Sequence, residues 1–377
     1  MNASEIILTV FQFFKKNIIV TKKIVYINLI IFLISFFLLD VILSNTYLNH
    51  KKKTCYLYEE FYYELKKNCK GLDKFKSSFP TVNVFTDEYG TRVGKNQKRN
   101  KSDKIFIFGD SFTFGVGLEF YQTYSGILSK EYKNFDFYNF AVSSYSPTVH
   151  LYKLEQQIKK KVIPKKIILF LDMTDVHDEA ARWTKFDKSG KPSLSTNYIF
   201  EKNKKKEKFI HKNFKVSRSF AHYINYNLRI LRRKQVSKQK ENEVKTSIQA
   251  GFTYRKLEDL GSHYQGNIFN EGQNKIRQKI NVISVISKKI NSEFYLVIYP
   301  FAETLVYGQK IFNWENYGNS LCKDDKCILI NTFEAFRNKK KKYNDWYSRF
   351  YFVKDEHFNY GGNEIIADVL KKKIFND

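Results

Sequence analysis

Proline is scarce in this chain, with five residues among 377, and no stretch is rich in both glycine and proline. No segment of the sequence repeats at a fixed period either. The first absence argues against a Gly/Pro-rich linker between domains, and the second argues against a repeat protein. The length therefore allows one large α/β domain with insertions, or two domains.

Recognised motifs for nucleic acids, nucleotides and metals are absent too. The sequence holds no helix-turn-helix, zinc-finger or RNP-type pattern, and the glycines of "GDSFTFGVG" follow neither GxxxxGK nor GxGxxG. The cysteine spacings fit a four-cysteine zinc site poorly, and no His, Asp or Glu cluster has a recognised ligand spacing. We therefore expect no nucleic-acid partner, no metal and no cofactor.

Negative charge is in short supply. The chain has 65 lysines and arginines against 38 aspartates and glutamates, which leaves a net charge of +27. The basic runs are scattered along the chain rather than gathered on one helix. Two interpretations stay open: a solvated lysine-rich surface, and attraction to anionic lipid or an acidic polysaccharide.

One long apolar run interrupts this polar sequence, at residues 24–43. Its length is about that needed to span a bilayer, and Asn28 and Asp40 are its strongly polar residues. Lysines in the preceding segment favour a cytoplasmic N-terminus, whereas the lysines at 51–53 weaken that assignment. No cleavage site of small residues is evident. We expect a cytoplasmic segment 1–23 and an uncleaved, single-pass anchor 24–43 in a bacterial inner membrane; the alternative is a buried helix of a soluble protein.

All four cysteines follow the apolar run. An even number of cysteines suits a disulfide-forming compartment, so we expect the folded domain on the periplasmic side. Closeness in the sequence favours the pairs Cys55–Cys69 and Cys322–Cys327, although three pairings are possible.

The rest of the chain alternates between apolar runs and helical patterns. Residues 44–80 indicate a polar stalk, and residues 81–377 indicate one α/β domain with an insertion at about 180–265. The predicted fold is a three-layer α/β/α domain with a mainly parallel sheet. We expect strands at 104–110, 135–142, 165–173, 293–300 and 326–332. We expect helices at 121–132, 148–161, 272–290 and 361–374.

Polar residues gather at three strand ends and ahead of the last helix. Ser111 follows the first strand, "AVSSYSP" the second and "DMTDVHDE" the third, while "KDEHFNYGG" precedes the last helix. Functional residues of open α/β sheets collect at the carboxyl ends of strands. A serine becomes a nucleophile only beside a base that a third group orients. His357, with Asp355 two residues before it, suits that role, and His177 is a second candidate base.

The block "GDSFTFG" behind an apolar strand, together with "DEHFNYGGN" near the C-terminus, resembles the SGNH (GDSL-type) hydrolase family. The resemblance covers roughly residues 85–375 and is closest to bacterial membrane-anchored members. It implies that Ser111 attacks an ester carbonyl, that His357 is the base and that Asp355 orients it. The preceding "FTDEYGTR" looks like the Gly-x-Arg segment of such members and places Arg92 at the arginine position.

Two blocks depart from that family pattern. Ser144 stands where the family has a glycine whose N–H binds the oxyanion, and Thr174 stands where it has an asparagine side-chain donor. The resemblance then implies an oxyanion site formed by the N–H groups of Ser111 and Ser144 and the Thr174 hydroxyl. Losing one such donor typically costs about 2.7–4 kcal/mol of transition-state stabilisation.

Other polar residues near these strand ends have two interpretations. Asp172, Asp175, His177 and Asp178 crowd the third strand end, where they either bind carbohydrate hydroxyls or cap the strand end. Asp110 and Arg92 are further candidate substrate-binding residues.

The function that these features imply is an SGNH-type serine esterase acting through an acyl-enzyme. Its expected substrate is an O-acyl group, most simply O-acetyl, of an envelope carbohydrate, or another ester. An O-acetyltransferase of a cell-surface polysaccharide is the first alternative, because the acceptor depends on water exclusion and pocket shape. The second is a catalytically weakened, glycan-binding SGNH-like protein with a protein partner in the envelope.

Overall fold

The computed structural model describes residues 3–46, 54–76, 78–99, 103–195 and 244–376, with 213–214, 216–217 and 220–221; within the first helix, side chains are described from residue 23 on. The chain forms two units. One comprises Met1–Lys51 with Lys202–Ser237, and the other comprises Lys52–Glu201 with Lys238–Asp377.

The first unit is built on one long helix, α1 (Ala3–Asn45). Its segment Lys23–Asn45 has a mean hydropathy of 2.5 over its most apolar window, and only 11% of that window is buried. That length and composition suit a membrane anchor or a signal sequence. Near the end of the helix, Asp40 accepts hydrogen bonds from the Ser44 hydroxyl and from the backbone N–H groups of Val216 and Ser217. The carboxylate in the apolar run is therefore paired.

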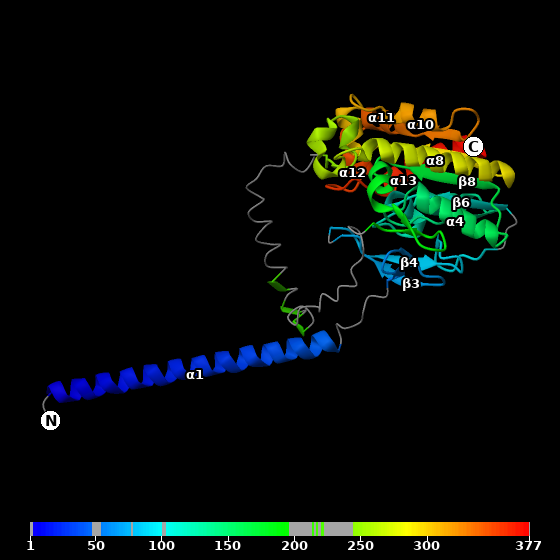
Figure 1. Ribbon diagram of the computed structural model, residues 1–377. Helices are drawn as coiled ribbons and strands as arrows, with labels where there is room; N and C mark the ends of the chain where they lie inside the picture. The colour runs from blue at the N-terminus through cyan, green and yellow to red at the C-terminus, as the bar shows by residue number, and fades with distance from the viewer. Residues whose placement is uncertain are drawn as a thin grey trace. The chain divides into compact units, whose positions relative to one another are not determined.

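The second unit contains a mixed eight-stranded sheet with the order β12-β11-β8-β6-β7-β5-β4-β3. Figure 1 labels four of these strands, β8, β6, β4 and β3. The first five strands are parallel to one another, and the last three add to the edge in antiparallel pairs. The parallel strands are β6 (Asp103–Phe108), β7 (Phe135–Asn139), β8 (Lys166–Leu171), β11 (Glu293–Ile298) and β12 (Ile328–Asn331). The antiparallel strands are β3 (Lys70–Asp73), β4 (Val82–Thr86) and β5 (Arg92–Val93). All five predicted parallel strands are present.

Helices cover both faces of this sheet, which gives the predicted three layers. On one face, α4 (Pro147–Lys159) packs on α8 (Ile268–Lys289), and α8 packs on α10 (Trp314–Leu321). On the other face, α13 (Tyr360–Leu370) packs on α3 (Tyr124–Glu131) and α11 (Phe333–Lys342). The four predicted helices correspond to α3, α4, α8 and α13. Shorter helical segments are α2 (Ser111–Phe114), η2 (Phe120–Gln122), α5 (Asp175–His177), η3 (Asp178–Arg182), η6 (Gly251–Thr253), η7 (Leu257–His263), α9 (Ala302–Tyr307), α12 (Trp346–Phe350) and η8 (Lys371–Phe375).

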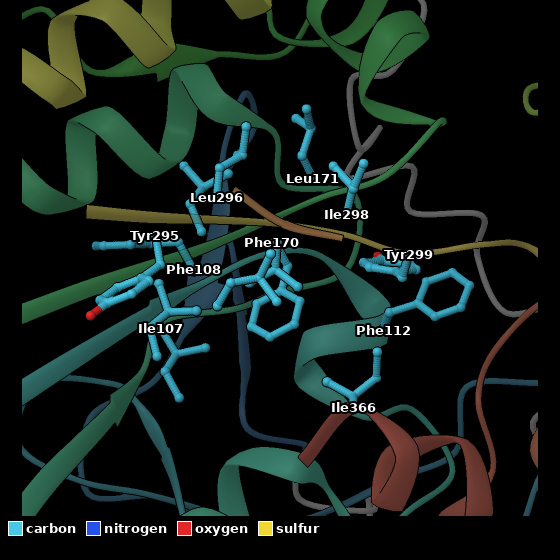
Figure 2. Packing of buried hydrophobic residues seen from close by; sticks show 14 of the residues in the cluster. Ile107, Phe108, Phe112, Phe170, Leu171, Tyr295, Leu296, Ile298, Tyr299 and Ile366 are labelled. Carbon is cyan, nitrogen blue, oxygen red and sulfur yellow. The ribbon is translucent and has the colours of Figure 1, made fainter. Parts of the chain in front are cut away.

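The core explains why the central strands read as unbroken apolar runs. Every residue of β8 is buried, because both faces of this strand are covered by helices. Figure 2 shows side chains from three adjacent strands in this core, including Ile107, Phe170 and Leu296. The same packing continues to Phe112 and Tyr299, whose ring centroids lie 5.0 Å apart (Figure 2). The core therefore extends to the carboxyl ends of the strands, where the polar residues lie.

Residues 54–80 do not form the stalk that we expected from the sequence. They contain a hairpin, β1 (Tyr56–Tyr58) with β2 (Tyr63–Leu65), and the edge strand β3 of the main sheet. Three aromatic residues explain the difference, because Tyr62, Tyr63 and Phe79 are buried rather than solvated. The Tyr63 ring lies 5.4 Å from the Trp183 ring. The segment is therefore part of the folded domain.

Both favoured cysteine pairs are disulfides, Cys55–Cys69 and Cys322–Cys327. Of the predicted insertion at 180–265, the structure describes a hairpin of β9 (Lys185–Phe186) with β10 (Pro192–Ser193) and the turns η6 and η7. Most of the stretch between them lies outside the described residues.

Candidate active site

Ser111 lies where the central strand β6 gives way to a single helical turn, α2. Asp110 caps this turn, since its Oδ1 accepts a hydrogen bond of 2.9 Å from the Phe112 N–H. Gly109 is required just before the cap, because a Cβ there would lie 2.0 Å from Thr113 Oγ1. The turn ends at Gly115, whose φ of 78° is left-handed. The "GDSFTFG" block thus places Ser111 at the carboxyl edge of the sheet.

His357 and Asp355 approach Ser111 from the loop between α12 and α13. Ser111 Oγ lies 2.7 Å from His357 Nε2, and His357 Nδ1 lies 2.5 Å from Asp355 Oδ1. The Asp355 carboxylate also accepts the His357 backbone N–H at 3.2 Å. Three residues that the sequence resemblance places in one triad therefore form one hydrogen-bonded series.

The surroundings of this series define its protonation states. Burial alone would raise the pKa of Asp355, but the hydrogen bond and charge of His357, and then those of Lys76, outweigh burial and lower this pKa. Asp355 is therefore a carboxylate at neutral pH and accepts from His357 Nδ1–H. In that tautomer His357 Nε2 is an acceptor for the Ser111 hydroxyl. The His357 ring packs against Phe75 and Phe112, at centroid distances of 5.0 and 4.6 Å.

A group of buried carboxyls lies directly behind Ser111. Asp110 Oδ2 is 3.1 Å from Ser111 Oγ, and the Tyr299 hydroxyl lies 3.5 Å from Asp110 and 3.3 Å from Asp172. Burial, followed by the charge of Asp172, raises the pKa of Asp110 well above its usual range. Burial and the neighbouring carboxylates likewise raise the pKa of Asp175. Burial and mutual repulsion therefore both disfavour ionisation of these carboxyls.

Ser144 and Thr174, the residues at the two altered positions of the family pattern, make different contacts in the structure. Ser144 follows β7, next to β6, and its φ of 58° is a left-handed conformation that usually calls for glycine. Its carbonyl accepts the Trp183 indole N–H at 2.7 Å. Thr174 is a correction to our expectation: its hydroxyl donates to Asp172 Oδ1 at 2.6 Å and is not free to serve an oxyanion.

Two of the expected substrate-binding residues, Arg92 and Asp175, are instead engaged inside the fold. Arg92 is fully buried, and its guanidinium donates to the carbonyls of Phe114, Gly115 and Leu118 instead of facing a ligand. Asp175 is buried and accepts the Asp172 backbone N–H at 2.9 Å. Asp175 thus closes the turn after β8, as the capping interpretation predicted.

His177 is buried as well, and its ring lies 5.0 Å from the His263 ring and 3.4 Å from Gln249 Nε2. Of the candidate bases, His357 is the one within hydrogen-bond distance of Ser111 in the described part of the chain.

Sequence reasoning missed a contribution from the segment after β3. Lys76 Nζ lies 2.6 Å from Asp355 Oδ2, and Phe75 packs on the His357 ring. The pattern "DKFKSSFP" offered one signal, since two phenylalanines in a polar segment indicate a buried side. Because we assigned this segment to a polar stalk, we did not expect its phenylalanines to be buried.

Among the described residues, one group could hold a metal ion by the closeness of its ligand atoms. It consists of Asp355, Glu356 and His357. Asp355 and His357 already bond to each other, and the ammonium groups of Lys76 and Lys245 lie on the carboxylates. Two cations at these oxygens oppose a third, so we interpret the group as part of the hydrogen-bonded series and not as metal ligands.

The fold and the site define a three-layer α/β/α protein with a serine, a histidine and a carboxylate in hydrogen-bonded series. The chain belongs to the family DUF1574, described as "Protein of unknown function", whose model matches residues 19–295. That range includes Ser111 and ends before Asp355 and His357. A search of curated proteins gives no match.

Three solved structures illustrate what this chain is similar to. Axe2, an acetylxylan esterase from Geobacillus stearothermophilus, is 12% identical with a TM-score of 0.38, over 74% of this chain and 96% of that one. A member of the lipolytic protein G-D-S-L family from Veillonella parvula is 12% identical with a TM-score of 0.38, over 73% and 99%. TesA is 10% identical with a TM-score of 0.38, over 71% and 96%.

Proposed function

We propose that the protein is an SGNH-type serine esterase that removes O-acyl groups, most simply O-acetyl groups, from an envelope carbohydrate. One observation carries this proposal, the hydrogen-bonded series of Ser111, His357 and Asp355. Ser111 Oγ lies 2.7 Å from His357 Nε2, although the two residues are 246 positions apart, and His357 Nδ1 lies 2.5 Å from Asp355 Oδ1. A serine, a base and an orienting carboxylate in this order are what acyl transfer through a covalent intermediate requires.

In the proposed reaction, Ser111 Oγ attacks the acyl carbonyl while His357 Nε2 takes the hydroxyl proton. The tetrahedral intermediate collapses, the sugar oxygen leaves with the proton from His357, and the acyl group remains on Ser111 as an ester. Water then attacks this ester with His357 as the base, which releases the carboxylic acid and restores the serine. The Ser111 and Ser144 N–H groups, each next to its strand end, are the proposed donors to the oxyanion.

A second candidate, an O-acyltransferase, is favoured by the burial of the site. Ser111 is 8% exposed and His357 is 3% exposed, so little of the nucleophile and the base is open to bulk solvent. When water is excluded, a bound sugar hydroxyl competes better for the acyl-enzyme. The complete hydrogen-bonded series supports either enzyme over a weakened glycan-binding protein.

The proposed location is the bacterial inner membrane, with α1 as a single-pass anchor and the α/β domain on the periplasmic side. The apolar segment Lys23–Asn45 and the two disulfides support this placement.

The test uses the full-length protein in detergent, labelled with a fluorophosphonate probe and assayed for p-nitrophenyl acetate hydrolysis. Ser111→Ala should abolish labelling and lower turnover by about 10³-fold or more, because the nucleophile is gone. Ser189→Ala is the matched control: this serine also contacts an aspartate, at 2.7 Å, but lies in an exposed turn. It should label and turn over like the wild type.

Equal labelling and turnover in wild type and Ser111→Ala would contradict the proposal, as would a wild type that neither labels nor turns over. Acetate released from O-acetylated xylan or another acetylated glycan, compared with acetyl transferred to an added sugar, distinguishes the esterase from the transferase.

A further inference from the structure

The Asp355 carboxylate has a second hydrogen-bonding neighbour besides His357, and this neighbour is a cation. Its Oδ1 accepts from His357, whereas its Oδ2 lies 2.6 Å from Lys76 Nζ. Lys76 comes from the segment after β3, 279 positions before Asp355 in the sequence. The two oxygens of one buried carboxylate are thus divided between the imidazole and a lysine from the edge of the sheet.

The segment that carries Lys76 is itself packed on the imidazole. The Phe75 ring lies 5.0 Å from the His357 ring at an interplanar angle of 75°, and Lys76 Nζ lies 4.8 Å from the Phe75 ring centroid. Farther along, the Phe79 ring lies 6.2 Å from the His357 ring and 4.6 Å from the Phe352 ring. Lys76 therefore reaches Asp355 from a backbone that aromatic contacts hold in place.

The other groups that face Asp355 are few among the described residues. Lys245 Nζ lies 3.8 Å from the same Oδ2, but its close ion pair is with Glu356. The Tyr347 hydroxyl donates to the Asp355 carbonyl at 3.2 Å and leaves the carboxylate alone. Lys76 is thus the closest cation on Oδ2, and Asp355 is 3% exposed whereas the Lys76 side chain is 42% exposed.

We propose that Lys76 is a positioning residue that holds Asp355 Oδ2 and so keeps Oδ1 on His357 Nδ1. This inference rests on the proposed function of the Ser111–His357–Asp355 site. A charge-assisted hydrogen bond on one oxygen restrains rotation of the carboxylate, which fixes the imidazole tautomer and ring plane. The same ammonium draws negative charge away from Oδ1 and repels an imidazolium, and both effects oppose protonation of His357.

Lys76→Met tests both consequences, because methionine keeps the aliphatic stem and removes the ammonium. Without the cation, His357 gains protons more readily, so the acid limb of the kcat/KM profile should move to higher pH by about 0.5–1 unit. The plateau value of kcat should fall about 3–10-fold with KM unchanged, because Asp355 is less well held. Lys76→Arg restores a cation and should recover most of the plateau.

Lys165→Met is the matched control. It removes the ammonium of a surface ion pair, in which Lys165 Nζ lies 2.8 Å from Oδ2 of Asp103, the first residue of β6. Its pH profile and plateau should equal those of the wild type. Because Lys76 is half-exposed, Lys76→Met is expected to melt within a few degrees of the wild type, and Lys76→Gln provides a second variant if it does not.

A second readout does not depend on turnover. The pKa of His357 is measured by NMR on full-length protein with histidine labelled at Cε1, and His357→Gln identifies the resonance. The expected result is a higher His357 pKa in Lys76→Met than in the wild type, by the same 0.5–1 unit. An unchanged His357 pKa together with an unchanged pH profile would overturn the role of Lys76. Failure of the proposed function looks different, since the wild type itself would then lack fluorophosphonate labelling.

Discussion

Arg92 provides a test of the site's architecture that does not depend on its chemistry. The side chain is fully buried, and its guanidinium donates to three backbone carbonyls, those of Phe114, Gly115 and Leu118. Burial lowers the pKa of Arg92 to about 10, so it stays charged at neutral pH. Arg92→Met fills part of the same volume but removes the guanidinium donor from all three carbonyls, of which that of Gly115 still accepts the Leu118 N–H at 3.2 Å.

The expected cost follows from those bonds. A hydrogen bond from a charged donor contributes about 1.5–3 kcal/mol, and the three bonds are not additive because the loop can relax. We expect a loss of about 3–5 kcal/mol in the free energy of unfolding, which corresponds to a fall in Tm of ~5–15 °C for a domain of this size. The affected loop directly follows α2, so fluorophosphonate labelling of Ser111 should also slow.

The assay is thermal unfolding of the full-length protein in detergent, with Arg255→Met as the matched control. Arg255 also donates to a backbone carbonyl, that of Asp259 at 2.9 Å, but it makes this bond near the surface. Its loss should cost less than about 1 kcal/mol. Arg92→Lys, which keeps the charge without the planar fork, should lie between the two. Equal Tm values for Arg92→Met and Arg255→Met would show that the bonds from Arg92 do not stabilise this loop.

Two further predictions concern stability. Burial and neighbouring charges raise the folded-state pKa of Asp175, so the stability of the wild type falls as pH rises from about 4 through that raised pKa. Asp175→Asn, which can still accept the Asp172 N–H, should have the same Tm as the wild type at pH 4 and a Tm about 3 °C or more higher at pH 8. A Tm difference that is the same at both pH values would contradict this prediction. Gly272→Ala should lower the free energy of unfolding by about 1–3 kcal/mol despite the better helix propensity of alanine, because its Cβ would lie 1.9 Å from the Val176 carbonyl oxygen. The control is Val285→Ala on the same helix, where the side chain is 67% exposed and the change should be less than about 0.5 kcal/mol. A Gly272→Ala variant more stable than the wild type would show that α8 can shift to make room for the methyl group.

The sequence alone was sufficient for the five parallel strands of the sheet and for proposing the members of the triad, but not for the antiparallel strands β3, β4 and β5. The apolar runs at β6, β8 and β11 are local patterns, and burial on both faces leaves the same pattern wherever a parallel strand is covered by helices. Ser111, Asp355 and His357 were identifiable because the "GDS" and "DEH" blocks resemble a known family. Those inferences depend on neighbours along the chain, and they hold without knowledge of the packing.

Only the tertiary structure decided what the remaining polar residues contact. Arg92 and Thr174 carry donors whose acceptors are a backbone loop and Asp172, and a donor type in a sequence does not identify its acceptor. Lys76 meets Asp355 across 279 positions of sequence, through a segment whose lysines and tyrosines resembled a stalk. The physical reason is the same in each case: hydrogen bonds and ion pairs act over about 3 Å in space, and the fold alone brings such distant residues that close.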